Sequence, residues 1–161
     1  MASPPPPASA DAAAHSVFVY GSLMSEEVVR ILLGRVPPSS PVRLPNHRRF
    51  SIRGRVYPAI LPVEGNEVSG KVFTGLTDWE LDVLDIFEDE RYVRETVAVS
   101  LAQDSSETIL AYAYIWRNVD DPDLYGEWDF DEWKKEHFKD YLTMTQDVKE
   151  KIEHLESKID D

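Results

Sequence analysis

The sequence contains no cysteine among its 161 residues. This absence excludes disulfide bonds, thiolate catalysis and cysteine-based zinc sites. The four histidines offer no substitute, because they are scattered and none forms a close ligand pair: His15, His47, His137 and His154. We therefore expect no metal site. A cysteine-free chain also suits a reducing compartment, and we expect a cytoplasmic location.

Long apolar runs are also missing, and positive charge is scarce. No stretch of about 18 apolar residues occurs, so the sequence predicts no membrane-spanning helix. Lysines and arginines number 17 against 30 aspartates and glutamates, which gives a formal net charge of -13. Nucleic acids and anionic membranes are themselves polyanions, so we expect neither as a partner.

Two common catalytic motifs are absent as well. Ser22 follows a glycine, but the G-x-S-x-G elbow of serine hydrolases does not occur. No glycine-rich phosphate-binding pattern is present either. Any chemistry must therefore come from carboxylates and backbone amides.

The composition divides the chain into three parts. Residues 1–15 are rich in proline, alanine and serine, with a run of prolines from Pro4 to Pro7, so we predict a disordered extension. A transit peptide is the alternative, but such peptides are rich in arginine and this stretch has none. Residues 16–145 are predicted to form one globular domain, and residues 146–161 a helical tail.

Strand and helix patterns are mixed along the domain, which predicts an α+β fold. The Val17–Val19 run is typical of a buried strand, and Ser25 to Leu33 of a short helix that ends at Gly34. Thr77 to Glu80 is a capping box that opens a second helix. Further strands are predicted within the ranges 42–61, 68–73, 95–101 and 109–116, with a turn at 64–66.

A long amphipathic helix is predicted from Asp129 onward. Its stripe recurs at steps of three and four: Phe130, Trp133, His137, Tyr141, Met144, Val148, Ile152, Leu155 and Ile159. The aromatic first half is expected to pack on the domain. The aliphatic second half either pairs with another chain or frays in solvent. We therefore expect a monomer, or a weak homodimer formed through this helix.

The stretch Val17–Met24 is the first candidate for a functional site. A strand, a glycine and a helix start follow one another, so several backbone N–H groups have no partner of their own. Such groups can point together at a carboxylate or a carbonyl oxygen, and Gly21 allows a ligand to approach the backbone closely. The same pattern also occurs in ordinary turns between a strand and a helix.

Glu88 is the second candidate. It follows Leu81 by seven residues and Leu84 by four, which places its carboxylate on the apolar face of the helix. An acid there is expected to be functional or to be paired, for example with Arg94. Burial by the leucines and repulsion from Asp85 would both raise its pKa, as proton transfer near neutral pH requires.

Basic residues cluster in one region of this acidic chain: Arg43, Arg48, Arg49, Arg53 and Arg55. They are predicted either to attract substrate carboxylates or to form the solvent face of exposed strands.

Four segments together resemble the γ-glutamylcyclotransferase family, and most closely its plant avirulence-induced (AIG2-like) branch. The resemblance extends from about Val17 to about Trp133. The segments are Tyr20-Gly21-Ser22-Leu23, Arg55-Val56-Tyr57-Pro58, Leu84-Asp85-Ile86-Phe87-Glu88 and Tyr92-Val93-Arg94-Glu95-Thr96-Val97.

The resemblance implies a small mixed β-barrel flanked by helices, to which this chain adds a long C-terminal helix. It implies Glu88 as the catalytic acid and base, and no cofactor. The substrate loop would comprise Tyr20, Gly21, Ser22, Leu23, Met24 and Ser25. Tyr92 would either lean into the pocket or belong to the barrel core. A defence or stress context is also implied.

The implied reaction cyclises a small γ-glutamyl compound to 5-oxoproline and releases an amine. The substrate carries both nucleophile and electrophile, so folding it and moving one proton is sufficient. The leaving group stays open between an amino acid, a peptide such as the remainder of glutathione, and a lysine side chain. Two alternatives remain: a protein that binds γ-glutamyl or other acidic metabolites without turnover, and an interaction protein acting through the C-terminal helix.

Overall fold

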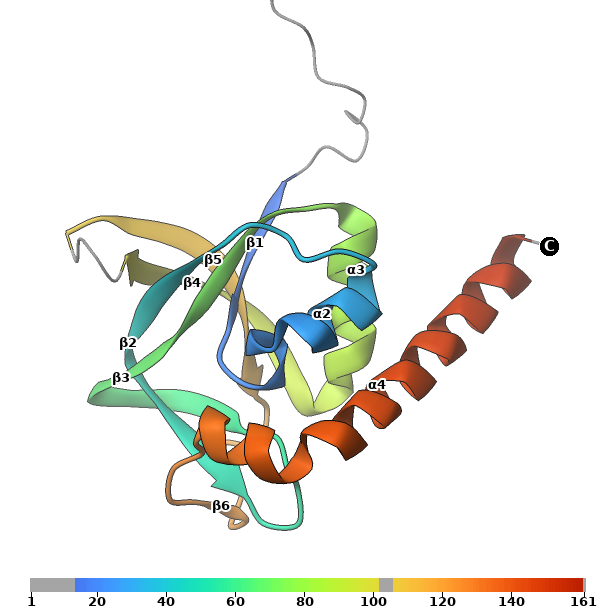
Figure 1. The fold of residues 1–161 in the computed structure, drawn as a ribbon. Helices are drawn as coiled ribbons and strands as arrows, with labels where there is room; N and C mark the ends of the chain where they lie inside the picture. The colour runs from blue at the N-terminus through green and yellow to red at the C-terminus, as the bar shows by residue number, and fades with distance from the viewer. Residues whose placement is uncertain (1–13, 102–105, 161) are drawn as a thin grey trace, which may run out of the picture.

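A computed structural model describes residues 14–101 and 106–160 and shows a closed, mixed β-barrel (Figure 1). The barrel strands follow the order β3-β1-β5-β4-β2, and β2 pairs again with β3. β1 and β5 are parallel, and the other pairs are antiparallel. The strands are β1 (His15–Val19), β2 (Ser39–Ile52), β3 (Ala59–Leu76), β4 (Tyr92–Leu101) and β5 (Thr108–Trp116), while β6 (Leu124–Tyr125) extends the sheet beyond β2. The predicted fold class is confirmed.

β1 forms the centre of the core. It pairs with β3 on one side and β5 on the other, and Val17, Phe18 and Val19 are all buried. This explains why the strand is a continuous apolar run rather than an alternating one. β3 approaches closely at Gly70, where an added Cβ would lie 2.3 Å from the carbonyl oxygen of Val19. Only a glycine fits at that point.

Within the part of the chain that the structure describes, three helices lie outside the barrel: α2 (Glu26–Leu33), α3 (Asp78–Glu88) and α4 (Phe130–Asp160). Two short 3-10 turns, η1 (Ser22–Met24) and η2 (Asp89–Arg91), precede α2 and follow α3. The predicted caps are confirmed. Ser25 accepts the Val28 amide, Gly34 has φ 79°, and Thr77 forms a capping box with Glu80.

The predicted turn at 64–66 is wrong, because β3 continues through it. The pairing jumps from Pro45 with Glu67 to His47 with Pro62, so the extra residues of β3 form a bulge. Asn46 (φ 61°) and Gly65 (φ 87°) absorb the distortion, and the Gly65 amide donates to Asn46 Oδ1 at 3.1 Å. Turn-forming residues here bend two long paired strands instead of reversing the chain.

α4 is one continuous helix across residue 145, and its later half extends along α2 (Figure 1). Lys149 Nζ donates to the carbonyl oxygen of Leu32 at 2.8 Å, and Ile152 is only 2% exposed. The aliphatic stripe therefore packs partly within its own chain. The domain boundary at 145 and the weak homodimer stay predictions. The extension proposed for residues 1–15 lies outside the described residues up to position 13, and β1 already begins at His15.

None of the helices in the described ranges is long and apolar enough to span a bilayer.

The burial of Ile152 generates the first testable prediction. Ile152→Ala should lower the free energy of unfolding by about 2–4 kcal/mol, because buried aliphatic truncations lose both transfer energy and packing. Leu155→Ala is the matched control on the same helix, and its side chain is 52% exposed. Chemical denaturation of the two variants measures the difference. Equal and small effects at both positions would show that the end of α4 does not belong to the core.

Candidate active site

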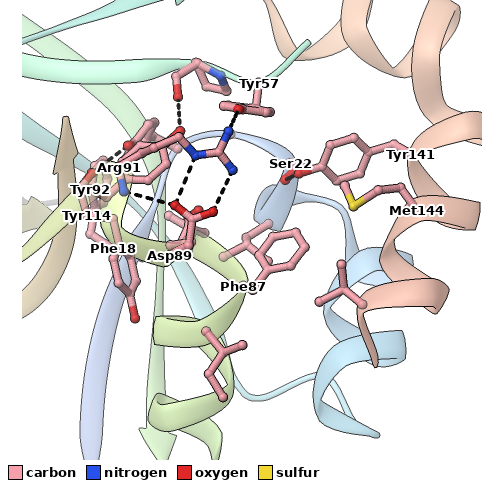
Figure 2. A pocket seen from close by; sticks show the side chains of 18 residues that line it. Phe18, Ser22, Tyr57, Phe87, Asp89, Arg91, Tyr92, Tyr114, Tyr141 and Met144 are labelled. Carbon is pink, nitrogen blue, oxygen red and sulfur yellow. Dashed lines mark hydrogen bonds and ion pairs between the residues drawn. The ribbon is translucent and has the colours of Figure 1, made fainter. Parts of the chain in front are cut away.

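A cavity of about 200 Å³ opens where the end of β1, the end of α3 and the middle of α4 meet. Pockets for drug-sized ligands usually have volumes of about 300–1,000 Å³, so this one suits a small metabolite. It is lined by Phe18, Val19, Tyr20, Gly21, Ser22, Leu23, Tyr57, Pro58, Ile86, Phe87, Glu88, Asp89, Arg91, Tyr92, Tyr114, Tyr141, Met144 and Val148. Figure 2 shows the Asp89–Arg91 pair on one side and Tyr141 and Met144 of α4 on the other.

The loop after β1 forms one wall of the cavity. Gly21 precedes η1, and the first amides of such a turn have no acceptor within the turn itself. A Cβ on Gly21 would lie 2.8 Å from two ring carbons of Pro58, so the loop and Pro58 approach as closely as only glycine permits. The contact with Pro58 therefore also requires a glycine at position 21 of the predicted substrate loop.

Two cations from the barrel hold this loop by its carbonyl groups. Arg49 of β2 donates to the carbonyl oxygen of Tyr20 at 2.8 Å, and Lys71 of β3 donates to that of Met24 at 2.9 Å. A trans peptide unit is planar, and its C=O and N–H point in opposite directions. The bond from Arg49 therefore directs the Gly21 amide away from β2. Arg49 thus positions the backbone of the loop. The sequence alone did not distinguish it from the neighbouring arginines.

The predicted loop residues do not all face the cavity. Tyr20, Gly21, Ser22 and Leu23 line it, and Ser22 Oγ donates to the hydroxyl of Tyr141 at 2.9 Å. Met24 and Ser25 are not among the lining residues. The hydroxyl of Ser25 caps α2 and donates to Glu27, which is a structural task.

Glu88 is the last residue of α3, and its partly buried side chain lines the cavity. No other residue of the described ranges forms a hydrogen bond or ion pair with its carboxylate. Burial, assisted by the negative charge of Asp89, raises the pKa of Glu88 to about 8, and Arg91 opposes this rise. An unpaired carboxylate that titrates near neutral pH can both accept and return a proton.

Four tyrosines surround Glu88, and burial raises the pKa of each hydroxyl: Tyr20, Tyr92, Tyr114 and Tyr141. All four rings line the same cavity as Glu88, and the charge of Glu88 contributes to the pKa shift of each of the four hydroxyls. Three of them donate to protein acceptors, namely Tyr20 to Tyr114 O (2.6 Å), Tyr92 to Pro58 O (2.8 Å) and Tyr114 to Asp85 Oδ1 (2.7 Å). These groups stay protonated at neutral pH and shape the cavity, leaving Glu88 as its titrating group.

Asp89 and Arg91 close one side of the cavity (Figure 2). The Nε and one terminal nitrogen of Arg91 donate to Asp89 at 3.0 and 2.7 Å, and the other terminal nitrogen donates to the hydroxyl of Tyr57. Burial acts to raise the pKa of Asp89, but its bonds with Arg91 hold that pKa below the usual range. Asp89 has φ 57° and ψ -165°, a region that costs about 1–3 kcal/mol for a residue with a side chain. Such strain is concentrated at functional sites.

Arg94, the partner predicted for Glu88 in the case of a structural role, is wrong. Arg94 pairs with Asp85 at 2.7 Å, and Asp85 also accepts the hydroxyl of Tyr114. The additional negative charge that acts on Glu88 is that of Asp89 rather than that of Asp85. Tyr92, whose role was open between pocket and core, serves both, since it lines the cavity and is buried against Trp116.

Sequence reasoning did not identify several lining residues as site residues: Tyr57, Asp89, Arg91, Tyr114, Tyr141 and Met144. Three of them could have been found from the sequence. Tyr57 lies in the Arg55-Val56-Tyr57-Pro58 motif, and Tyr141 and Met144 lie on the apolar stripe of the long helix. Apart from Arg91, no arginine lines the cavity. Within residues 14–101 and 106–160, no group of three His, Asp or Glu side chains is placed to hold a metal ion.

Known proteins share both the sequence pattern and the fold. The family model described as gamma-glutamyl cyclotransferase, AIG2-like, matches residues 17–134. The chain is 53% identical to AIG2-like protein D of Arabidopsis thaliana over 145 residues, which cover 90% of this chain and 95% of that protein. A solution structure of an Arabidopsis thaliana protein matches with a TM-score of 0.67 and 41% identity, over 85% of this chain and 91% of that one. A solved gamma-glutamyl cyclotransferase, with a TM-score of 0.56 and 20% identity over 65% of this chain and 68% of its own, shares the fold.

The raised pKa of Glu88 generates a prediction about stability and pH. Its folded-state pKa of about 8 exceeds the ordinary value of 4.5. The folded state therefore binds more protons than the unfolded state between these values, and stability falls as pH rises through this window. Glu88→Gln removes this dependence, so the stability difference between the variant and the wild type should grow in favour of the variant from pH 5 to pH 9.

Denaturant unfolding at the two pH values measures this difference. Glu90→Gln is the control, because Glu90 is exposed and lies outside the cavity. A stability difference for Glu88→Gln that is the same at both pH values would show that the carboxylate is not titrating in this window.

Proposed function

The chain belongs to the gamma-glutamyl cyclotransferase, AIG2-like family, and we propose that it catalyses the cyclisation of a γ-glutamyl compound to 5-oxoproline with release of an amine. The observation that carries this proposal is Glu88. A carboxylate with no partner among the described residues and with a pKa of about 8 lines a metabolite-sized cavity, next to a loop whose carbonyl groups accept hydrogen bonds from Arg49 and Lys71.

The reaction needs binding geometry more than complex chemistry. The α-amine of the substrate attacks its own γ-carbonyl carbon, a new C–N bond forms, and the old amide C–N bond breaks. Holding the chain folded so that these atoms meet converts binding energy into rate. The cavity, about 200 Å³ in volume, favours such a folded conformer over an extended one.

Glu88 moves the proton in both directions. Its ionised carboxylate accepts a proton from the substrate ammonium, which makes the amine nucleophilic. The protonated Glu88 then donates to the departing nitrogen, and the ionised Glu88 accepts the second proton that the attacking nitrogen loses as the ring closes. That proton leaves with the amine, which departs as its ammonium. One group performs both steps because its pKa lies near the working pH. The buried tyrosines exclude water and keep their own protons.

The loop after β1 binds the negatively charged groups of the substrate. The open amides at the start of η1 suit the substrate α-carboxylate or the oxyanion that develops on the γ-carbonyl. Arg49 and Lys71 bond to the carbonyl side of the same loop, which keeps the peptide units oriented before substrate arrives. Pre-oriented donors of this kind stabilise charge that develops during a reaction.

The assay incubates the protein with γ-glutamyl amino acids, γ-glutamylamines and glutathione and measures 5-oxoproline. Formation of 5-oxoproline supports the enzyme. Calorimetric binding of these compounds without 5-oxoproline would instead indicate a protein that binds γ-glutamyl metabolites without turnover.

The catalytic role of Glu88 gives the third prediction. Glu88→Gln keeps the size of the side chain but removes the titrating group, so kcat should fall by about 10²–10⁴-fold, the usual contribution of general acid–base catalysis. Glu90→Gln makes the same substitution at an exposed position outside the cavity and should keep wild-type turnover. Steady-state kinetics on the best substrate of the panel measures both.

The pH profile supplies an independent check. In the wild type, kcat/KM should be low at acid pH, rise with an apparent pKa of about 8 and then level off. This acid limb is expected because Glu88 must be ionised to accept the proton. That limb should be absent from the residual activity of Glu88→Gln. A Gln variant with the original rate and limb would exclude Glu88 as the proton carrier.

A further inference from the structure

The cavity has a buried end and an open end. Phe18, Tyr20 and Leu23 are each at most 6% exposed, whereas Ile86 is 50% and Met144 is 37% exposed. If the loop after β1 holds the glutamyl group, that group occupies the buried end. The amine part of the substrate must then extend past Ile86 and Met144. This placement of the amine part rests on the proposed function.

Apolar side chains of α3 and α4 form one side of the opening: Ile86, Phe87, Met144 and Val148, called here the helical rim. Its position relative to the substrate loop is fixed by Tyr141. The Tyr141 ring packs edge-on against Phe87 with centroids 6.4 Å apart, and its hydroxyl accepts a hydrogen bond from Ser22. Figure 2 shows Tyr141 and Met144 reaching from α4 toward Ser22.

The charged side of the opening offers little to a cationic amine part. Apart from Glu88, the charged side chains that line the cavity are Asp89 and Arg91, and they bind each other through two hydrogen bonds. The remaining terminal nitrogen of Arg91 donates to Tyr57. An ammonium would have to displace Arg91 from Asp89, and it would lose hydration against the helical rim. An apolar group would instead bury the exposed Ile86 and Met144 side chains.

We propose that the helical rim binds the amine part of the substrate, and that this part carries an apolar side group of about leucine size. The substrate class is therefore γ-glutamyl derivatives of apolar amino acids, rather than of glycine or of the lysine side chain. α4 acts as a specificity element, and Glu88 carries out the same proton transfers whichever amine leaves.

Three substrates test this proposal: γ-glutamyl-L-leucine, γ-glutamylglycine and ε-(γ-glutamyl)-L-lysine. The leucine and glycine compounds share the second carboxylate, so their comparison isolates the apolar side group. The value of kcat/KM for the leucine compound should exceed that for each of the others by about tenfold or more, since apolar pockets discriminate side groups by roughly 10–200-fold. Values within about twofold of one another, or a preference for the lysine compound, would overturn the proposal.

Variants of the rim locate the preference on α4. Met144→Lys places a cation in the rim and should bring the leucine-to-glycine ratio of kcat/KM close to one. Met144→Leu keeps an apolar side chain and should keep the ratio. Leu155→Lys is the matched control, because Leu155 is exposed on the same helix and does not line the cavity. A Met144→Lys enzyme that retains the wild-type ratio would show that α4 does not contact the amine part.

Binding measured on Glu88→Gln separates this proposal from the proposed function. Titration calorimetry compares the Kd of γ-glutamyl-L-leucine with that of γ-glutamylglycine in a protein that does not turn them over. Failure of the wild type to form 5-oxoproline from any compound would refute the proposed reaction alone, and tighter binding of the leucine compound would still support the rim. Equal binding of the two compounds, or binding of neither, would overturn the rim proposal.

Discussion

The close approach of β1 and β3 is the constraint on which the cavity depends. With no side chain at Gly70, β3 can lie against the carbonyl of Val19 and the ring of Phe18 and pair with β2 on its other edge. The barrel closes there. Closure also places Arg49 of β2 and Lys71 of β3 next to the two ends of the loop after β1. A side chain at Gly70 would separate the strands and move both cations away from the carbonyl groups they hold.

The cavity contains two features that oppose stability. Glu88 is partly buried and has no partner among the described residues. Its ionised form is therefore unfavourable, and its pKa is raised to about 8. Next to it, Asp89 adopts a strained backbone conformation that its bonds with Arg91 maintain. Both features lie at the end of α3. Glu88 is its last residue, and Asp89 forms the turn that follows. The surrounding core of aromatic and aliphatic side chains supplies the stability that tolerates them.

Local signals in the sequence were sufficient for the helices and for part of the site. The Thr77 capping box, Gly34 and the apolar face that carries Glu88 depend on neighbours within one or two helical turns, so periodicity and caps reveal them. The order of strands, the parallel pairing of β1 with β5 and the bulge near Gly65 depend on contacts between distant residues. The same limit applies to the site. The pairing of Arg94 with Asp85 and the reach of Tyr141 to Ser22 are visible only once the chain has folded.

The two ends of the cavity come from different parts of the chain. The loop after β1, the end of α3 and the tyrosines of β4 and β5 lie within residues 17–134, the segment that the family model matches. Tyr141, Met144 and Val148 lie beyond it, on α4. The proposed chemistry thus belongs to the barrel, and the proposed selection of the amine to the part of α4 that lies beyond the matched segment. Tyr141 joins α4 to Ser22, so we expect changes in α4 to alter which amine is accepted. The backbone of the loop that contains Ser22 stays in place, because Arg49 and Lys71 of the barrel bind its carbonyl groups.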